Sequence, residues 1–380
     1  MITTSGSNYD VYLNSPVGQR LKVIPDFVKL NYSYAEKKLG NLVIVVPIKY
    51  LPFVSEYCQI EIWRKAAGQT IAKLELEALW IILYYRPYVS DRGELLLEIA
   101  AVDGKLALLN RIVAYFSGTS QASKSGFAGN IIKSIASENI ASTANDYTGT
   151  ANTGLYPRGI PSNYFSIQPN LNDGASVDMS FAWQNCLEAM QDIADASETA
   201  GTYLGFDTVY DGAGKLELRT YSKQRGTDRT LNSMNPVILD PSFGNFGSAQ
   251  FEFDYNNEIN FVYCGGQDTG TSRKVATSAN VARWTLGPFS RRETFEDARQ
   301  SDTLAQVQDS ADAALRAGKG NIVFSGQLIE TPFNRYGIDY NFGDILPCQF
   351  LGKLNNCRLN QLAVNVEGKE EIQVQLTGIL

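Results

Sequence analysis

The chain has 380 residues, more than one small hydrophobic core needs, which predicts two to four domains. It carries 40 acidic and 33 basic residues, a net charge of −7, and this balance argues against wrapping nucleic acid through clustered Lys and Arg. It contains no histidine, so Ser-His-Asp catalysis, Cys-His catalysis and the usual histidine zinc sites are excluded. Paired carboxylates are the catalytic groups that remain.

The first hundred residues read as β structure, because short apolar runs alternate with turn residues. A strand at 58–65 alternates isoleucines with Glu61, which predicts that Glu61 faces solvent. The apolar runs 42–47 and 79–85 are too short to cross a bilayer and are expected to be core strands. About six strands in this region predict a compact β-barrel or sandwich.

Helices are expected farther along the chain, where apolar residues recur at helical spacing. A short helix is predicted at 104–113, and longer ones at 127–139 and 180–197, with Ser125 and Ser180 as N-caps.

The stripe of the 180–197 helix is interpreted as core packing, and it contains Trp183, Leu187, Met190 and Ala194. A further helix is predicted within 287–320, with Gly318 as its C-cap and an apolar side made of Leu304, Val307, Ala311, Ala314 and Leu315.

The segment 201–266 is the clearest β region in the middle of the chain. Two alternating runs surround a turn at residues 211–214, and a second pair surrounds Asn256-Asn257. This period-two spacing predicts two antiparallel hairpins, each with one buried face. Residues 321–380 are again β.

The pattern predicts a mixed, β-rich α+β protein with β domains near both ends and α+β domains between them. The polar linker 118–126 marks the first boundary. Residues 137–178 are rich in Ser, Thr, Asn, Gly and Pro, which predicts irregular surface structure that contacts a neighbour. The expected domains, which can interleave, are a β domain at 1–115, a mixed helical domain at 116–200, an antiparallel β domain at 201–280, and a helix with a β domain at 281–380.

Two acidic pairs are candidates for glycosidase-type carboxylates: Asp207 with Asp211, and Asp339 with Asp344. The favoured alternative is that Asp211 fixes a turn and that Asp339 and Asp344 flank one. The Gly-rich turn at 211–214 has no helix after it and so does not match a dinucleotide-binding fingerprint. We therefore assign no catalytic and no cofactor-binding residues.

No metal site is expected, because no spaced DxDxDG loop is present. The mixed-charge segments 225–229 and 291–293 are expected to form local salt bridges or contacts between subunits rather than phosphate sites. The N-terminus shows no signal peptide pattern. The cysteines are odd in number and lack CxxC spacing, which indicates reduced, mostly buried thiols at Cys58, Cys186, Cys264, Cys348 and Cys357.

The chain resembles the siphophage tail-hub proteins, which are related in architecture to the baseplate hub of contractile phages. The likeness rests on the order and spacing of several short segments, and it spans most of the chain. These segments are 21–30, 109–111, 205–210, 225–230, 243–245, 260–267, 291–295 and 336–344.

The resemblance implies a structural virion protein rather than an enzyme, with tube-like β-barrel domains near both ends. Such hubs are homotrimers at the tail tip, in which two tube-like domains per subunit make a ring of six. The implied partners are other copies of the chain, the tail tube or distal-tail ring, the tape-measure protein, and tip or fibre proteins. Genome DNA would pass through an acidic channel without specific binding.

The implied location is the virion tail tip, after assembly in the host cytoplasm, without a membrane span. Some relatives carry C-terminal fibre or cell-wall-degrading domains. This sequence stops at Leu380, which leaves receptor binding and peptidoglycan cleavage to other proteins. Two alternatives stay open: a carbohydrate-binding or depolymerising tail-tip protein, and the hub of a related injection machine such as a gene-transfer particle or a secretion spike.

Overall fold

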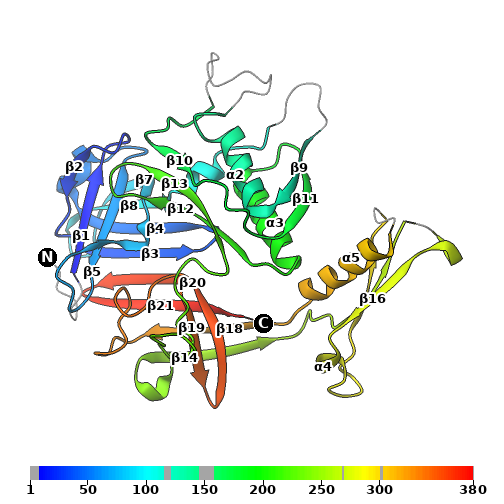
Figure 1. Ribbon diagram of the computed structural model, residues 1–380. Coiled ribbons are helices and arrows are strands. Elements are labelled where there is room, and N and C mark those ends of the chain that lie inside the picture. Colours follow the sequence, from blue (N-terminus) through cyan, green and yellow to red (C-terminus); the bar gives the residue numbers. More distant parts are fainter. Residues whose placement is uncertain (1–7, 115–120, 145–157, 268, 300–302, 380) are drawn as a thin grey trace.

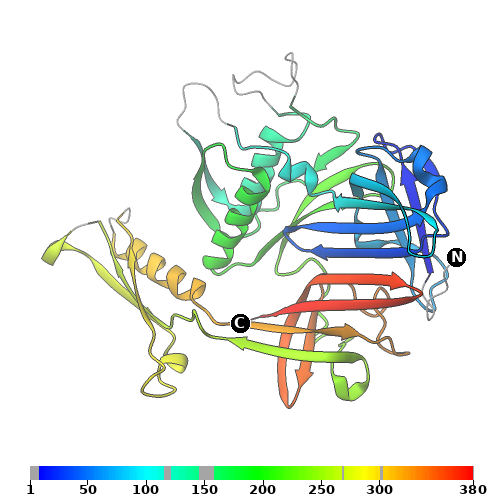
Figure 2. The same ribbon diagram turned by 180° about the vertical axis from the view of Figure 1, so that it is seen from behind.

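The computed structural model describes residues 8–114, 121–144, 158–267, 269–299 and 303–379. Figures 1 and 2 show it from opposite sides. The described helices are α1 (Leu106–Leu109), α2 (Ala128–Asn139), α3 (Cys186–Thr199), α4 (Val281–Trp284) and α5 (Leu304–Ala317). The strands are β1 (Asn8–Asn14), β2 (Arg20–Val23), β3 (Lys29–Ala35), β4 (Lys38–Pro47), β5 (Gln59–Lys65), β6 (Lys73–Leu74), β7 (Trp80–Val89), β8 (Leu95–Asp103), β9 (Ala122–Phe127), β10 (Phe165–Ile167), β11 (Ser176–Phe181), β12 (Leu204–Tyr210), β13 (Leu216–Ser222), β14 (Phe246–Asp254), β15 (Phe261–Gly265), β16 (Val275–Ala279), β17 (Glu293–Asp297), β18 (Asn321–Leu328), β19 (Ile345–Phe350), β20 (Lys353–Glu367) and β21 (Lys369–Gly378).

Thirteen of the described strands form one sheet that joins the two ends of the chain. Its order is β14-β18-β21-β20-β3-β4-β8-β7-β5-β1-β2, with β19 beside β20 and β6 beside β5. The N-terminal and C-terminal strands meet where β3 pairs antiparallel with β20, from Leu30↔Val366 to Ala35↔Gln361. In both views the blue and red ribbons therefore lie side by side (Figures 1 and 2). We call this ladder the β3–β20 seam.

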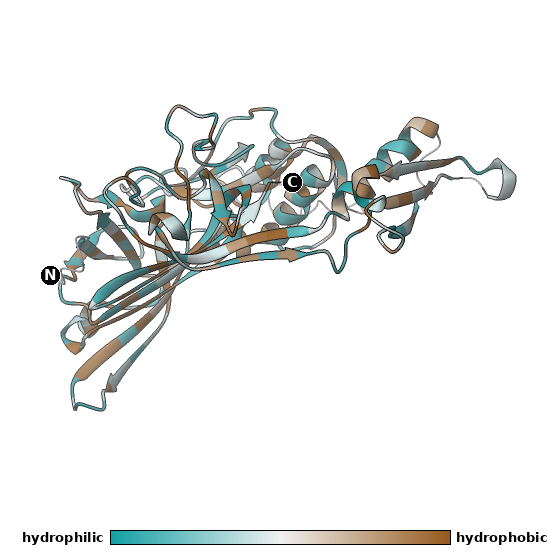
Figure 3. Cartoon of the chain, turned by 90° about the horizontal axis from the view of Figure 1, so that it is seen from below, coloured by the Kyte–Doolittle hydropathy of each residue, from teal (hydrophilic) through white to brown (hydrophobic). Residues whose placement is uncertain are grey.

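Alternating side chains build the core of this sheet. In β3 every second residue is buried, namely Leu30, Tyr32 and Tyr34, and β1 buries Tyr9, Val11 and Leu13 in the same way. Hydrophobic and hydrophilic segments accordingly alternate along the strands (Figure 3). Burying one large apolar side chain contributes roughly 1.5–3 kcal/mol, so this alternation fixes which face of each strand is internal.

A second unit lies above the sheet and contains helices α2 and α3. These helices pack on each other and on the small sheet β10-β13-β12, and β9 pairs with β11 beside them. Their buried residues form a separate core that includes Ile132, Met190 and Phe206. In Figure 1 this unit surrounds the labels α2, α3, β9 and β11, and we call it the helical module.

A third unit, the distal lobe, projects away from the sheet (Figure 1). It contains the sheet β16-β15-β17 with α5 on one face, and its own small core includes Val262, Cys264 and Val307. The chain enters it after β14 and returns into β18, and Asp254 pairs with Asn321 at that point. The distal lobe is thus an insertion between two adjacent strands of the large sheet.

This insertion corrects one prediction. The alternating runs around Asn256-Asn257 were expected to pair as a hairpin, but β14 pairs with β18, and β15 pairs with β16 and β17. Alternation shows that a run is a half-buried strand but does not identify its partner, so the two runs belong to different sheets. The other expected hairpin is confirmed, since β12 pairs antiparallel with β13 across the turn at Asp211.

The helices predicted at 127–139 and 180–197 are present as α2 and α3, but both predicted N-caps are wrong. Ser125 and Ser180 lie in the β9–β11 ladder, where they face Asp178 and Ser123. Helix α2 begins at Ala128, without a side-chain cap.

Helix α3 begins at Cys186, where the Asn185 side chain accepts hydrogen bonds from the backbone N–H groups of Leu187 (2.9 Å) and Glu188 (3.4 Å). Trp183 lies outside the helix and is 51% exposed, so it is not part of the apolar stripe. An Asn at N-cap satisfies the same free N–H groups as a Ser.

Several smaller predictions also need correction. The helix expected at 104–113 is the single turn α1. Glu61 is buried rather than solvent-facing, because Asn14 and Tyr210 donate hydrogen bonds to its carboxylate. In the run 79–85, Leu83 and Tyr84 are about half exposed.

The linker and the irregular segment contain more regular structure than expected. Residues 122–126 of the linker belong to β9, whereas 118–120 lie outside the described residues. Strand β10 and the first three residues of β11 lie within 137–178, and residues 145–157 of that segment are outside the described part. Helix α5 ends at its predicted C-cap Gly318 and begins with a capping box at Thr303. Its first residue, Leu304, is exposed.

Candidate functional site

The carboxylates of the two candidate acidic pairs make contacts that hold the fold together. Asp207 is fully buried in β12, whereas Asp211 lies in the exposed turn and accepts the N–H groups of Ala213 (2.7 Å) and Lys215 (3.0 Å). Asp211 therefore fixes a turn, as the alternative predicted.

The second pair is also structural. Asp339 accepts hydrogen bonds from the backbone and guanidinium of Arg335. Asp344 is buried and accepts the N–H groups of Thr227 (2.6 Å) and Asn341 (3.0 Å). Both carboxylates hold turns in place, which agrees with the favoured interpretation.

Asp207 is the centre of a buried ion cluster that joins the helical module to the large sheet. Its carboxylate pairs with Lys105 at 2.9 Å and with Arg225, and it accepts a 2.7 Å hydrogen bond from the Tyr34 hydroxyl. Lys105 also pairs with Asp103 at 2.8 Å. The members of the cluster lie in β3, at the end of β8, in β12 and after β13, so the cluster connects four parts of the chain.

Both charges at the middle of this cluster are maintained. Burial alone would raise the pKa of Asp207, but Lys105 and Arg225 hold that pKa below its usual value of 3.8. Burial would lower the pKa of Lys105, yet Asp103 and Asp207 raise it above its usual range. A permanently ionised pair is a structural tie rather than a proton donor.

A second buried charge cluster connects β5 with the C-terminal strands. The Arg64 guanidinium pairs with Glu370 at 2.7 Å and with Glu330 at 3.1 Å, and it donates to the carbonyl oxygen of Tyr336 at 3.0 Å. Arg64 and Glu370 are 306 residues apart in the sequence. This cluster holds the first β region against the last one.

The mixed-charge segments behave differently from each other. Arg291 pairs locally with Glu293, as expected. Arg225 instead reaches Asp207 and Glu77, and Arg229 lies 3.5 Å from Asp344, so the contacts of the 225–229 segment are long-range. All five cysteines are free and buried, which confirms that prediction.

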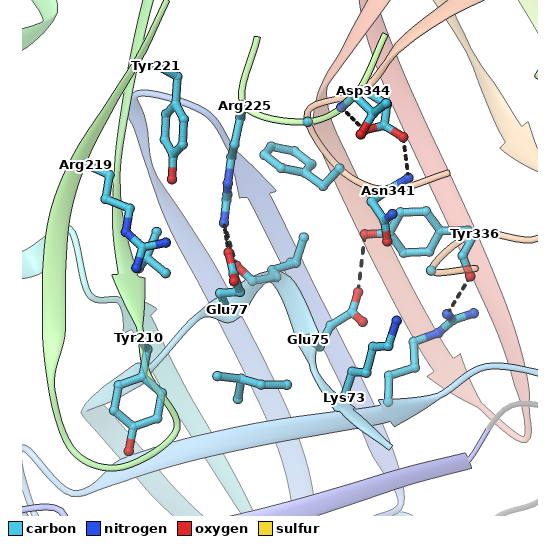
Figure 4. A pocket seen from close by; sticks show the side chains of 18 of the residues that line it. Lys73, Glu75, Glu77, Tyr210, Arg219, Tyr221, Arg225, Tyr336, Asn341 and Asp344 are labelled. Carbon is cyan, nitrogen blue, oxygen red and sulfur yellow. Dashed lines mark hydrogen bonds and ion pairs between the residues drawn. The ribbon is translucent and has the colours of Figure 1, made fainter. Parts of the chain in front are cut away.

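A cavity of about 600 Å³ lies where the helical module meets the N-terminal and C-terminal parts of the large sheet. Figure 4 shows its wall: Tyr210, Arg219, Tyr221 and Arg225 lie on the side of β12–β13, and Tyr336, Asn341 and Asp344 lie opposite. Lys73, Glu75 and Glu77 lie between these two groups. We call this space the junction cavity.

The large sheet ends in strand β2 on one side and in strand β14 on the other. All four residues of the end strand β2 are exposed, including the apolar Leu21 (37%) and Val23 (47%). At the opposite end β14 has a bulge between Gly247 and Gln250. Strand edges carry unpaired N–H and C=O groups and are ready to pair with another chain.

Among the residues that the structure describes, no group of three or more Cys, Asp or Glu side chains is placed to hold a metal ion. No described helix is both long enough and apolar enough to span a bilayer.

The arrangement of these units is also found in solved structures of phage tail proteins. A tail protein from Neisseria meningitidis MC58 is 14% identical, with a TM-score of 0.58 over 97% of this chain and 96% of that one. The 43 kDa tail protein of prophage MuSo2 from Shewanella oneidensis is 12% identical, with a TM-score of 0.57 over 97% and 98%. Prophage tail protein gp18 from Listeria monocytogenes EGD-e is 12% identical, with a TM-score of 0.52 over 97% and 94%. The fold is therefore that of phage tail proteins.

The model of the Siphovirus ReqiPepy6 Gp37-like protein family matches residues 17–377, nearly the whole chain. The chain belongs to this family. No curated protein matches its sequence. The resemblance to siphophage tail proteins that the sequence suggested is thus confirmed.

Sequence reasoning missed the residues that hold the units together. No local pattern predicts that Arg64 and Lys105 are buried. Their partners Glu370 and Asp207 lie 306 and 102 residues away in the sequence. Arg225 belongs to a segment that was singled out for its charge. Its partners became known only from the tertiary structure.

Proposed function

We propose that this protein is the trimeric hub of a long-tailed phage and connects the tail tube to the tail tip. The observation that carries the proposal is the β3–β20 seam. Through this seam, one chain presents two β regions as a single continuous sheet with two free edges. The family match and the phage tail fold support a structural role in the tail.

In the proposed assembly, the β2 edge of one copy faces the β14 edge of the next. Such a head-to-tail contact forms a ring when the rotation between copies closes, and three copies with two tube-like β domains each give six units. Ring closure also removes the exposed strand edges, which would otherwise promote aggregation. The ring would match the six-fold symmetry of a tail tube or distal-tail ring.

The ring would border the DNA channel at the tail tip. The chain is acidic, with a net charge of −7, so like charges would let the genome pass without binding. The proposed partners are the tube or distal-tail ring, the tape-measure protein and the tip or fibre proteins. The proposed role needs no catalysis, and assembly would take place in the host cytoplasm.

Native mass spectrometry of the purified chain tests the proposal. We expect a species of three times the 41.9 kDa subunit mass, and three copies per tail in isolated particles. A stable monomer that cleaves glycans would overturn the proposal. A basic channel in the structure of the assembled ring would contradict the part that concerns DNA passage.

A hub of another injection machine is a second candidate. One observation favours it: the fold is similar to a chain of the Francisella PdpA-VgrG complex, with a TM-score of 0.53 and 9% identity over 59% of that chain. The siphovirus family match favours the phage tail instead. The genes that neighbour this one would separate the two candidates.

A further inference from the structure

The junction cavity has the size and position of a small-molecule site. Its volume of about 600 Å³ falls within the range of roughly 300–1,000 Å³ that is common for ligand pockets, and such pockets often lie between domains. Three parts of the chain contribute to its wall: the segment from Arg64 to Glu77, the hairpin β12–β13, and the turn region from Tyr336 to Asp344.

Four aromatic residues line the cavity, and Tyr221 of the hairpin is the one with a partly exposed ring. Tyr210, Tyr336 and Phe342 are buried in the wall. A tyrosine offers a flat apolar face together with a hydroxyl group. The C–H faces of a sugar ring pack on such faces while its hydroxyl groups bond to neighbouring polar atoms.

The charged groups of the wall balance each other. Four cationic side chains and four carboxylates line the cavity, namely Arg64, Lys73, Arg219, Arg225, Glu75, Glu77, Asp211 and Asp344. Most have partners in the wall or behind it, such as Arg225 with Glu77 at 3.2 Å. A ligand with a net charge would enter without a counter-charge and would lose its hydration, which is costly. A neutral ligand with many hydroxyl groups can donate to the carboxylates and accept from the guanidinium groups.

The backbone of the cavity wall is strained. Leu76 and Glu77 are consecutive non-glycine residues with φ of 59° and 50°, in the left-handed region. Such residues cost on the order of 1–3 kcal/mol each and cluster at ligand sites. Arg225 holds this turn by donating to the carbonyl oxygen of Leu76 at 3.0 Å.

Glu75 precedes this turn and is nearly buried, and the Tyr336 hydroxyl is 3.4 Å from its carboxylate, a long hydrogen bond. Burial raises the pKa of Glu75 above its usual value. The Glu75 carboxylate accepts hydrogen bonds from hydroxyl groups, as the contact with Tyr336 shows. The aromatic wall, the balanced charges and the strained turn thus occur together in one cavity.

We propose that the junction cavity binds a neutral saccharide. The ring of one sugar residue packs against Tyr221, and its hydroxyl groups contact Glu77 and Arg219. This site is separate from the edges that form the proposed ring, so the two proposals can fail independently.

An array of immobilised glycans tests this inference on the full-length protein. The array contains neutral glycans ending in hexose, deoxyhexose or N-acetylhexosamine, and acidic glycans that carry phosphate, sulfate or uronic acid. We expect binding to at least one neutral class, confirmed by calorimetry with the free sugar. Binding to no neutral glycan, or tighter binding to the acidic set, overturns the proposal.

Two variants locate the site. Tyr221→Ala and Arg219→Ala should each weaken binding of the free sugar by at least tenfold, while their circular dichroism spectra and melting temperatures show that they are folded. Tyr84→Ala is the matched control, because Tyr84 is an exposed tyrosine of β7 that does not line the cavity. If Tyr221→Ala and Arg219→Ala bind as tightly as the Tyr84 control, the sugar lies elsewhere and the assignment is wrong.

Discussion

At the scale of single residues, the buried charges carry the strongest constraints on this fold. Lys105 and Asp207 are completely shielded from solvent, and the pair is compensated by Asp103, Arg225 and Tyr34. A buried ion pair adds little net stability compared with an apolar pair, but removing one partner leaves an uncompensated charge. The cluster therefore requires all its members.

Asp207→Asn should destabilise the protein by about 3–5 kcal/mol, because Lys105 and Arg225 would remain buried without their carboxylate. Urea denaturation followed by circular dichroism measures this loss. Asp211→Asn is the control, since an asparagine oxygen also accepts the turn N–H groups, and the expected change is below about 1 kcal/mol. Equal effects of the two changes would show that the buried cluster is not important for stability.

Glu75→Gln should stabilise the protein at neutral pH. Burial raises the pKa of Glu75 above its usual value of 4.5, so the folded state binds this proton more tightly than the unfolded state. The resulting stability is fully present below pH 4.5 and is lost as the pH rises through the folded pKa. Glu75→Gln removes this loss, so we expect the variant to be more stable than the wild type at pH 7.5, by an amount that grows with pH.

Melting temperatures of wild type and Glu75→Gln between pH 4 and pH 8 measure the effect. The difference between the two proteins should grow with pH and vanish near pH 4. A difference that is constant across this range would mean that the ionisation of Glu75 is not responsible.

At the scale of elements, the distal lobe is an independent addition to the sheet. It has its own core, and the strands on either side of it, β14 and β18, pair directly with each other. It contacts the helical module through the hydrogen bond that Arg316 donates to the carbonyl oxygen of Thr199, at 2.6 Å. The large sheet is therefore expected to form without the lobe.

Replacing residues 255–320 with an Asn-Gly turn should join β14 and β18 as a hairpin, because Asp254 and Asn321 are already paired. The free energy of unfolding should decrease by no more than about 1–2 kcal/mol, because the change removes only the Arg316 hydrogen bond and small packing contacts. Differential scanning calorimetry tests this. Loss of cooperative unfolding would show that the lobe is required for the sheet.

At the scale of the whole molecule, the two free edges of the large sheet determine how copies can associate. Strand β2 exposes Leu21 and Val23, whereas β14 is at the other end of the same sheet. The proposed ring uses both edges. Charges on an edge strand prevent pairing without disturbing the interior.

The double change Leu21→Asp and Val23→Asp should convert the trimer into a monomer, with a change in subunit stability of less than about 1 kcal/mol, because both side chains are exposed. Analytical ultracentrifugation measures the mass. Leu304→Asp in the distal lobe is a matched control, as Leu304 is also exposed and apolar. A trimer that survives the double change would exclude the β2 edge from the interface.

Local patterns were sufficient to predict most strands but not their partners. The alternation in β14 and β15 marked both as half-buried strands, yet the two belong to different sheets. The serines at 125 and 180 have the chemistry of N-caps, but they lie in a strand ladder, because the chain turns into each helix several residues later. None of the junction cavity was predicted, since its wall combines residues from three distant segments.

The sequence by itself determined the β-rich character of the chain, the free buried cysteines, the turn at Asp211 and the resemblance to phage tail proteins. These features depend on composition, on periods of a few residues and on the order of short segments. Only the tertiary structure decided that the two ends share one sheet, that the distal lobe is an insertion, and that Arg64, Lys105 and Asp207 are buried together. The physical reason is that strand pairing and charge burial depend on groups hundreds of residues apart, and no local pattern specifies which of them will meet.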